Sequence, residues 1–223
     1  MVEYYQPRPD VAALVPRESR VVLDVGCGAG LLGAQLKADN PERVVYGIEP
    51  ESEAAARART ALDGVLESTA EAPWPDDWRR PDCLVFADVL EHMTDPWSTL
   101  RNLCARLPSG ADVVLSVPNA AHYSVVGPLV LYGRWEYRDQ GILDRTHLRF
   151  FTRKTAFELV SGAGLHVKRV ERRLGWPAGT LGGGLRLLTT LERHREDRVG
   201  VRAAGRRLLD HITVQYLFLA RKH

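Results

Sequence analysis

The chain has 223 residues, of which 45% are hydrophobic and 26% charged, a composition typical of folded globular proteins and not of disordered ones. Its 30 Lys and Arg residues nearly balance 28 Asp and Glu residues, so the net charge of +2 predicts no polyanionic partner such as nucleic acid. No stretch approaches the ~18 consecutive apolar residues of a membrane span. Three widely spaced cysteines, Cys27, Cys83 and Cys104, fit neither a disulfide framework nor a zinc cluster. Because residues 1–9 contain no apolar signal segment, we expect a cytoplasmic globular domain, and the sequence does not indicate its oligomeric state.

Predicted strands and helices alternate along the chain. Short β-branched or apolar runs predict seven strands, at residues 21–25, 43–48, 64–67, 83–87, 113–117, 165–170 and 212–220. Apolar residues at helical spacing predict helices at residues 31–38, 52–62, 96–107 and 152–163. This alternation favours an α/β fold: a doubly wound, mostly parallel sheet with helices on both faces.

Two stretches interrupt this rhythm. Residues 119–151 form a connection longer than is usual inside a compact domain, and it is rich in aromatic residues. Residues 176–210 are rich in glycine and then in arginine, and a helix with a solvated face is expected there. Because no linker divides the chain, residues 1–223 are predicted to form one domain with two insertions.

A glycine turn follows the first predicted strand. Gly26, Gly28 and Gly30 tolerate positive φ and let a ligand approach the backbone, while the N–H groups that begin the next helix favour an anion. Asp24 at the strand end can accept hydrogen bonds from an ammonium group. Glu49 ends the second strand, where a carboxylate can bind the two hydroxyls of a ribose. Together these residues predict a nucleoside with an amino-acid tail, which is S-adenosylmethionine.

Four segments resemble motifs of the class I S-adenosylmethionine-dependent methyltransferases: residues 22–30, 46–50, 86–93 and 116–119. The resemblance spans residues 21–220 and implies a Rossmann-like seven-stranded sheet whose last strand is antiparallel. It implies cofactor contacts at Asp24, Gly26, Cys27, Gly28, Gly30, Glu49, Pro50, Thr69, Ala70, Ala87, Asp88 and His92. The chain departs from many relatives after the third strand, where Thr69 stands in place of an acidic residue that contacts the adenine amine.

Two alternatives use the same glycines. Gly28, Gly30 and Gly33 also satisfy the dinucleotide fingerprint, which would predict an NAD-dependent oxidoreductase. In that arrangement the first glycine follows the strand directly, whereas Gly26 and Cys27 intervene here. The other alternative is a catalytically inactive S-adenosylmethionine-binding protein that acts as a partner of another chain.

Three histidines follow predicted strand ends or lie before the penultimate helix. His147 lies in residues 143–151, which resemble a segment near the acceptor cleft of bacterial methyltransferases of small molecules and sugars. We therefore predict His147 as general base or acceptor anchor, with Asp144 orienting it and His122 as the second candidate. The expected reaction is O-methylation of a small molecule, such as a sugar or secondary metabolite, with residues 119–151 on the acceptor side. No compact metal-ligand spacing is present, so no metal is predicted.

Overall fold

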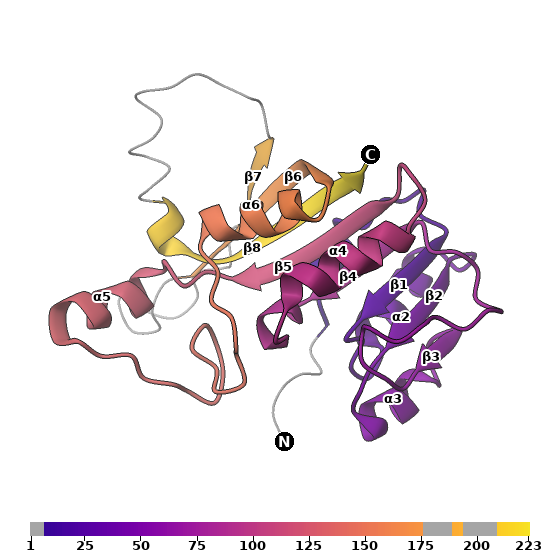
Figure 1. Cartoon of the computed structure of the whole chain (residues 1–223), viewed down its shortest axis with the longest axis horizontal. Coiled ribbons are helices and arrows are strands. Elements are labelled where there is room, and N and C mark those ends of the chain that lie inside the picture. Colours follow the sequence, from indigo (N-terminus) through magenta and orange to yellow (C-terminus); the bar gives the residue numbers. More distant parts are fainter. Residues whose placement is uncertain (1–6, 176–188, 194–208) are drawn as a thin grey trace.

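The computed structural model describes residues 7–175, 189–193 and 209–223, and these residues form one eight-stranded sheet with helices on both faces (Figure 1). The strand order is β3-β2-β1-β4-β5-β8-β6-β7. The elements are α1 (Pro9–Ala12), β1 (Val21–Val25), α2 (Leu31–Asp39), β2 (Val44–Ile48), α3 (Ser52–Ala58), β3 (Gly64–Leu66), β4 (Cys83–Ala87), the 3-10 helix η1 (Leu90–His92), α4 (Pro96–Arg106), β5 (Asp112–Pro118), α5 (Tyr123–Tyr132), α6 (Arg153–Gly162), β6 (Leu165–Leu174), β7 (Thr189–Arg193) and β8 (Thr213–Lys222).

The predicted sheet is confirmed. Strands β1 to β5 pair in parallel, and β8 lies antiparallel between β5 and β6. Every strand that the sequence predicted is present, together with an eighth, β7, which pairs antiparallel with β6.

β7 corrects one expectation, because it falls in the segment that the arginine-rich composition predicted to be helical. The pairing of residues 189–193 with the edge of β6 outweighs the local helical preference, since a sheet edge offers unpaired backbone groups. The remainder of that predicted insertion, at residues 176–188 and 194–208, lies outside the described residues.

Apolar layers cover both faces of the sheet. Successive residues of β1 point to opposite faces, so Leu23 packs in the layer beneath α4 and α6 while Val22 packs in the layer with α1 and α2. All five residues of β1 are buried, as expected for a central parallel strand. None of the helices in the described ranges combines the length and apolarity needed to cross a bilayer.

The long connection between β5 and α6 leaves the sheet and returns to the same place. It contains α5, which extends away from the sheet (Figure 1), and its two ends meet where Asn119 bridges Phe151 and the Ala120 amide donates to the Phe151 carbonyl at 2.7 Å. The two ends of the connection therefore lie together at the carboxyl edge of the sheet, where β1, β2 and β4 also end.

Candidate active site

The glycine turn after β1 has the backbone that its residues predict. Gly26, Gly28 and Gly30 have φ of +72°, +52° and +80°, in the left-handed region that favours glycine. The Gly26 amide donates to the Ile48 carbonyl at 2.7 Å, which fixes the turn to the end of β2. A Cβ at Gly26 would lie 2.4 Å from Val89 Cγ2 in the loop after β4. Both conformation and space therefore require glycine at position 26.

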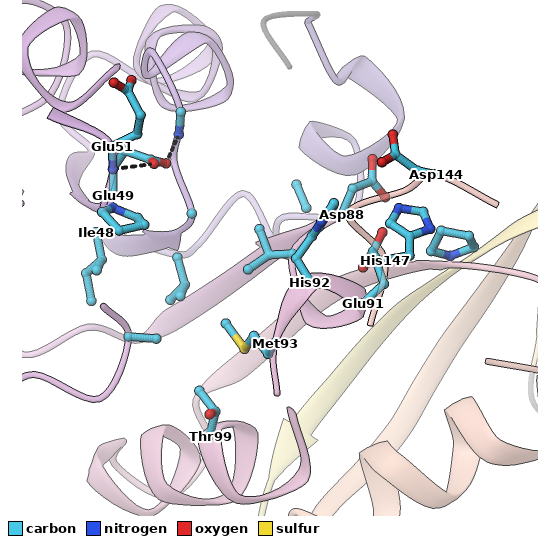
Figure 2. Close-up of a pocket in the computed structure, with 18 of the residues that line it drawn as sticks. Ile48, Glu49, Glu51, Asp88, Glu91, His92, Met93, Thr99, Asp144 and His147 are labelled. Atoms are coloured by element: carbon cyan, nitrogen blue, oxygen red, sulfur yellow. Dashed lines mark hydrogen bonds between the residues drawn. The ribbon is translucent and has the colours of Figure 1, made fainter. Parts of the chain in front are cut away.

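Glu49 holds the turn from the neighbouring strand. Its Oε2 accepts a hydrogen bond from the Gly28 amide at 2.8 Å, and its Oε1 accepts one from the Glu51 amide at 3.0 Å (Figure 2). A carboxylate oxygen has more than one acceptor site, so each can also receive a ligand hydroxyl. Glu49 is thus positioned both to shape the turn and to bind a diol.

Asp24 lies beneath the turn. It is buried, and its Oδ1 has no hydrogen-bond partner among the described residues. Burial and the negative charge of Glu49 raise the pKa of Asp24 to about 7. Burying an ionised carboxylate without a partner costs free energy unless a cation lies beside it. Asp24 is therefore suited to bind the ammonium group of an amino-acid ligand. The Cys27 side chain packs in the apolar layer with α2.

One cavity of about 1050 Å³ runs along the carboxyl edge of the sheet from Gly26 to His147. This volume lies at the upper end of the ~300–1,000 Å³ typical of ligand pockets. Most predicted cofactor residues line it: Gly26, Gly28, Glu49, Pro50, Thr69, Ala70, Ala87, Asp88 and His92. The other three predicted residues, Asp24, Cys27 and Gly30, are not in its wall.

A carboxylate that the sequence analysis did not select lies near Thr69. Glu71 lines the cavity, and its Oε1 accepts a hydrogen bond from Thr99 Oγ1 at 2.9 Å. Burial opposes ionisation of Glu71, but hydrogen bonds from Thr69, its own backbone and Thr99 outweigh it and lower its pKa. Glu71 therefore places a carboxylate in the cavity wall two residues after Thr69.

The end of β4 is held by side-chain contacts. Asp88 is the one non-glycine residue of the described chain with positive φ, +57°. Its carboxylate accepts hydrogen bonds from Ser116 Oγ at 2.7 Å and from Gln215, and it forms an ion pair with Arg8. These contacts join the end of β4 to β5, β8 and the segment before α1. They also stabilise the strained backbone of Asp88, which begins the loop that carries Glu91 and His92. Arg8 and Gln215 also line the cavity, although neither lies in a recognisable sequence motif.

His147 lies at the far end of the cavity (Figure 2). It is buried, and its Nδ1 lies 3.0 Å from the Ile142 carbonyl. Because a carbonyl only accepts, Nδ1 carries a proton, and in the neutral ring Nε2 carries the lone pair. Asp144 does not make the predicted orienting contact: its Oδ1 accepts hydrogen bonds from the Thr146 amide and hydroxyl, at 2.8 Å and 2.6 Å. The ring is oriented by a main-chain carbonyl instead.

His122, the second catalytic candidate predicted from the sequence, is not among the residues that line this cavity. Its Nε2 lies 3.2 Å from the Gly175 carbonyl, and its Nδ1 lies 2.7 Å from Ser124 Oγ at the start of α5. Both ring nitrogens therefore serve structural hydrogen bonds, because this histidine caps α5 and ties it to the end of β6.

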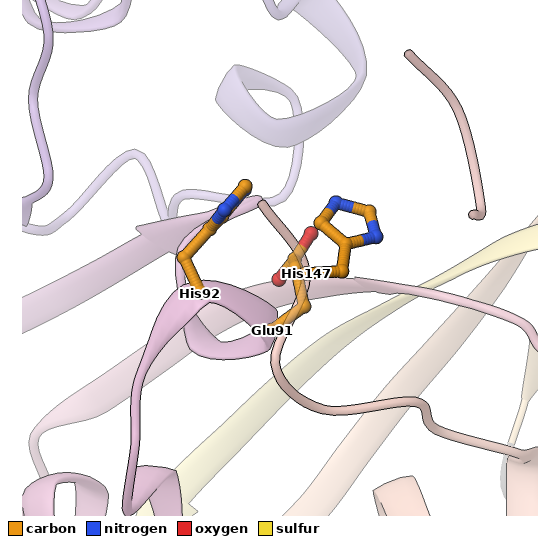
Figure 3. Close-up of side chains that lie close together, drawn as sticks. All are labelled: Glu91, His92 and His147. Carbon is orange, nitrogen blue, oxygen red and sulfur yellow. The ribbon is translucent and has the colours of Figure 1, made fainter. Parts of the chain in front are cut away.

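The fold brings His147 beside two side chains that are adjacent in the sequence, Glu91 and His92, and we call these three the Glu91 cluster (Figure 3). The rings of His92 and His147 meet edge to face with centroids 4.7 Å apart. Glu91 is buried, and burial together with the negative charge of Asp88 raises its pKa well above the usual range. Spacing in the sequence predicted no metal-ligand set, because His147 joins the other two only through the return of the long connection.

A family model described as a methyltransferase domain matches residues 2–170. This chain belongs to the methyltransferase-domain family. The match confirms the resemblance to class I S-adenosylmethionine-dependent enzymes and identifies S-adenosylmethionine as the cofactor, so the dinucleotide alternative is set aside.

Individual relatives of this methyltransferase are distant. The chain is 29% identical over 102 residues to a ubiquinone biosynthesis O-methyltransferase of Aliivibrio fischeri, covering 44% of each chain. It is 32% identical over 124 residues to a trans-aconitate 2-methyltransferase of Rhodococcus jostii, covering 53% of this chain and 47% of that one. The matches thus span less than half the length of these relatives.

The fold is also found in a solved structure. An S-adenosylmethionine-dependent methyltransferase of Thermotoga maritima, described as a possible histamine N-methyltransferase, superposes with a TM-score of 0.65. Its sequence identity is 17%, and the superposition covers 96% of this chain and 86% of that one. At this identity the likeness shows the fold alone.

Proposed function

We propose that this methyltransferase transfers the methyl group of S-adenosylmethionine to an oxygen atom of a small molecule bound beside His147. The observation that carries the proposal is the single cavity, whose wall contains both the Gly26–Glu49 end and His147. Donor and acceptor can therefore meet without leaving the protein, which the in-line geometry of methyl transfer requires.

Residues at the first end of the cavity hold the donor. Glu49 binds the ribose hydroxyls, and the amide groups of the glycine turn bind the carboxylate of the amino-acid tail. Asp24 attracts its ammonium group from beneath the turn, while Thr69 and Glu71 lie on the adenine side. The sulfonium supplies an activated methyl group. The protein must then place the acceptor atom in line with the bond between that methyl group and sulfur.

His147 binds the acceptor hydroxyl at the other end. Its Nε2 lone pair is available as base or anchor because Nδ1 is held by the Ile142 carbonyl. Oxygen is favoured over nitrogen because the two relatives compared by sequence include one named as an O-methyltransferase. A sugar or secondary metabolite carrying hydroxyl groups is the acceptor class that we propose.

Calorimetry with S-adenosylhomocysteine tests the donor half of this proposal, and transfer of a radiolabelled methyl group tests the acceptor half. The acceptors are matched pairs that differ only in a hydroxyl or an amine, drawn from sugars and phenolic metabolites. Transfer to the hydroxyl member supports the proposal. Binding of the cofactor product with no transfer to any acceptor would favour the inactive binding protein, and transfer to amines alone would overturn the oxygen assignment.

A further inference from the structure

The Glu91 cluster offers three ligand atoms to one small volume. One carboxylate oxygen and one nitrogen from each of two imidazoles all lie within 4.8 Å of one another. Figure 3 shows the Glu91 carboxylate between the rings of His92 and His147 in this view. All three residues line the cavity, so a ligand at this point would also be reached from the acceptor side.

Glu91 is the member of the cluster that most requires a partner. It is 1% exposed, and neither oxygen of its carboxylate has a hydrogen-bond partner of standard geometry within the described residues. The carboxylates of Asp88 and Asp144 are close enough to add negative charge at Glu91, and Arg8, the nearby cation, is paired with Asp88 and Asp10. A buried carboxylate in such surroundings is stabilised by a bound cation.

Both histidines are oriented from their Nδ1 atoms. His147 Nδ1 lies 3.0 Å from the Ile142 carbonyl, and His92 Nδ1 lies 3.3 Å from the Thr146 carbonyl. A carbonyl only accepts, and the Thr146 hydroxyl, which lies 3.1 Å from His92 Nδ1, donates its own proton to Asp144. Each Nδ1 therefore carries a proton, and in the neutral ring Nε2 carries the lone pair. Histidines that bind metals are typically oriented in this way by a hydrogen bond from the other ring nitrogen.

Main-chain hydrogen bonds join the segment that carries Glu91 and His92 to the segment that carries His147. The Glu91 carbonyl accepts hydrogen bonds from the amides of Leu148 at 2.8 Å and Arg149 at 3.0 Å. These bonds join η1 directly to the segment that carries His147. The segments that carry the three side chains are thus joined by main-chain hydrogen bonds.

We propose that Glu91, His92 and His147 bind one divalent first-row transition-metal ion that holds an oxygen of the methyl acceptor. Two imidazoles and one carboxylate suit ions such as Zn²⁺ and Fe²⁺ and leave coordination positions open. Bonds of ~2.1 Å at tetrahedral angles place ligand atoms about 3.4 Å apart. Small side-chain rotations from the observed separation would therefore close the site around an ion.

This inference rests on the proposed function and makes it more specific. A divalent ion lowers the pKa of a hydroxyl that contacts it, so the hydroxyl can lose its proton to solvent near neutral pH. The oxygen then bonds the methyl carbon, and the electron pair of the broken carbon–sulfur bond stays on sulfur. His147 acts here as a ligand that anchors the acceptor, and an acceptor oxygen fills the fourth, open position of the tetrahedral site.

The test is Zn²⁺ binding by the full chain after treatment with a chelator, measured by calorimetry and by metal content after dialysis. We expect one equivalent of Zn²⁺ in the wild type and an affinity at least about 100-fold weaker in Glu91→Gln, which keeps the shape of the side chain. Thermal unfolding and S-adenosylhomocysteine binding should be unchanged in this variant. His147→Ala is a second variant in case Glu91→Gln fails to fold.

A matched control addresses adventitious zinc. His166 and His223 lie with ring centroids 5.7 Å apart outside the cavity, so the double variant His166→Ala/His223→Ala should keep the full equivalent of Zn²⁺. No zinc in the wild type, equal binding by wild type and Glu91→Gln, or loss of zinc in the control would each overturn the inference. Cofactor-product binding without zinc binding refutes this inference alone, and zinc binding without cofactor-product binding refutes the proposed function alone.

Discussion

The two ends of the cavity are built differently. At the donor end, the contacts lie within and between consecutive elements: the turn after β1 is held by Ile48 and Glu49 at the end of β2. At the acceptor end, Glu91 and His147 come from segments separated by α4, β5 and α5. Donor binding is therefore encoded in short contiguous motifs, whereas the chemistry of the acceptor end depends on how the long connection returns to the sheet. The following predictions test that distinction.

The largest effect is expected at the acceptor end. His147→Ala should lower kcat by about 10²–10⁴-fold, the range for removal of a positioned acid–base group, while the Kd of S-adenosylmethionine changes little. Steady-state kinetics with the acceptor found in the transfer assay, together with calorimetry, measures both quantities. His122→Ala is the control, since His122 caps α5 and lies outside the cavity wall: its kcat should stay near that of the wild type. Equal losses in the two variants would remove the special role of His147.

At the donor end, Glu49→Ala should weaken cofactor binding by at least about 100-fold. The variant loses the acceptors for the Gly28 and Glu51 amides as well as for the ribose, and hydrogen bonds to charged groups contribute about 1.5–3 kcal/mol each. Glu67→Ala is a matched control, because Glu67 follows the next strand but does not line the cavity. Calorimetry on both variants is decisive, and a Kd within twofold of wild type for Glu49→Ala would refute the proposed role.

Gly26→Ala should destabilise the protein by about 2–4 kcal/mol. The added Cβ overlaps Val89, and the positive φ costs a further ~1–2 kcal/mol. Chemical denaturation measures the loss. Gly110→Ala isolates the second contribution, because Gly110 has φ of +82° with nothing within 4 Å of its added Cβ.

The double variant Gly26→Ala/Val89→Ala completes this cycle. It should recover the part of the lost free energy of unfolding that comes from overlap with the Val89 side chain, and it should retain the part that comes from the positive φ. If Gly26→Ala costs no more than Gly110→Ala, the close approach of the two loops is not a constraint.

The smallest effect concerns the pH dependence of stability. With a pKa of about 7 in the native state against about 3.9 in the unfolded chain, Asp24 keeps a proton between these values that the unfolded chain has lost. Its contribution to stability is thus complete below about pH 4 and is lost as the pH rises through 7. As the pH rises from 5 to 7, the free energy of unfolding of the wild type should fall by about 2 kcal/mol more than that of Asp24→Asn, which has no carboxyl group at this position. Parallel curves for the two proteins would contradict the raised pKa.

Much of the fold and of the donor end could be predicted from local patterns. Runs such as residues 83–87 are apolar throughout because the strand is buried on both faces, and Gly26 is required by backbone conformation. Such signals need no knowledge of distant contacts. The antiparallel last strand came from the resemblance to the family and not from any local pattern.

The acceptor end was predicted less completely, for a physical reason. The orientation of His147 by the Ile142 carbonyl, the structural bonds of His122 and the approach of Glu91 to His147 are all tertiary contacts. No spacing along the chain reports them. β7 was missed for the same reason, because the edge of β6 and not the composition of residues 189–193 determines its conformation.

The two hydrogen bonds that the Glu91 carbonyl accepts come from the amides of Leu148 and Arg149, not from their side chains. Leu148 is 50% exposed, and replacing it or Arg149 by any residue other than proline leaves both donors in place. The attachment of the His147 segment to η1 therefore does not depend on which side chains stand at these two positions.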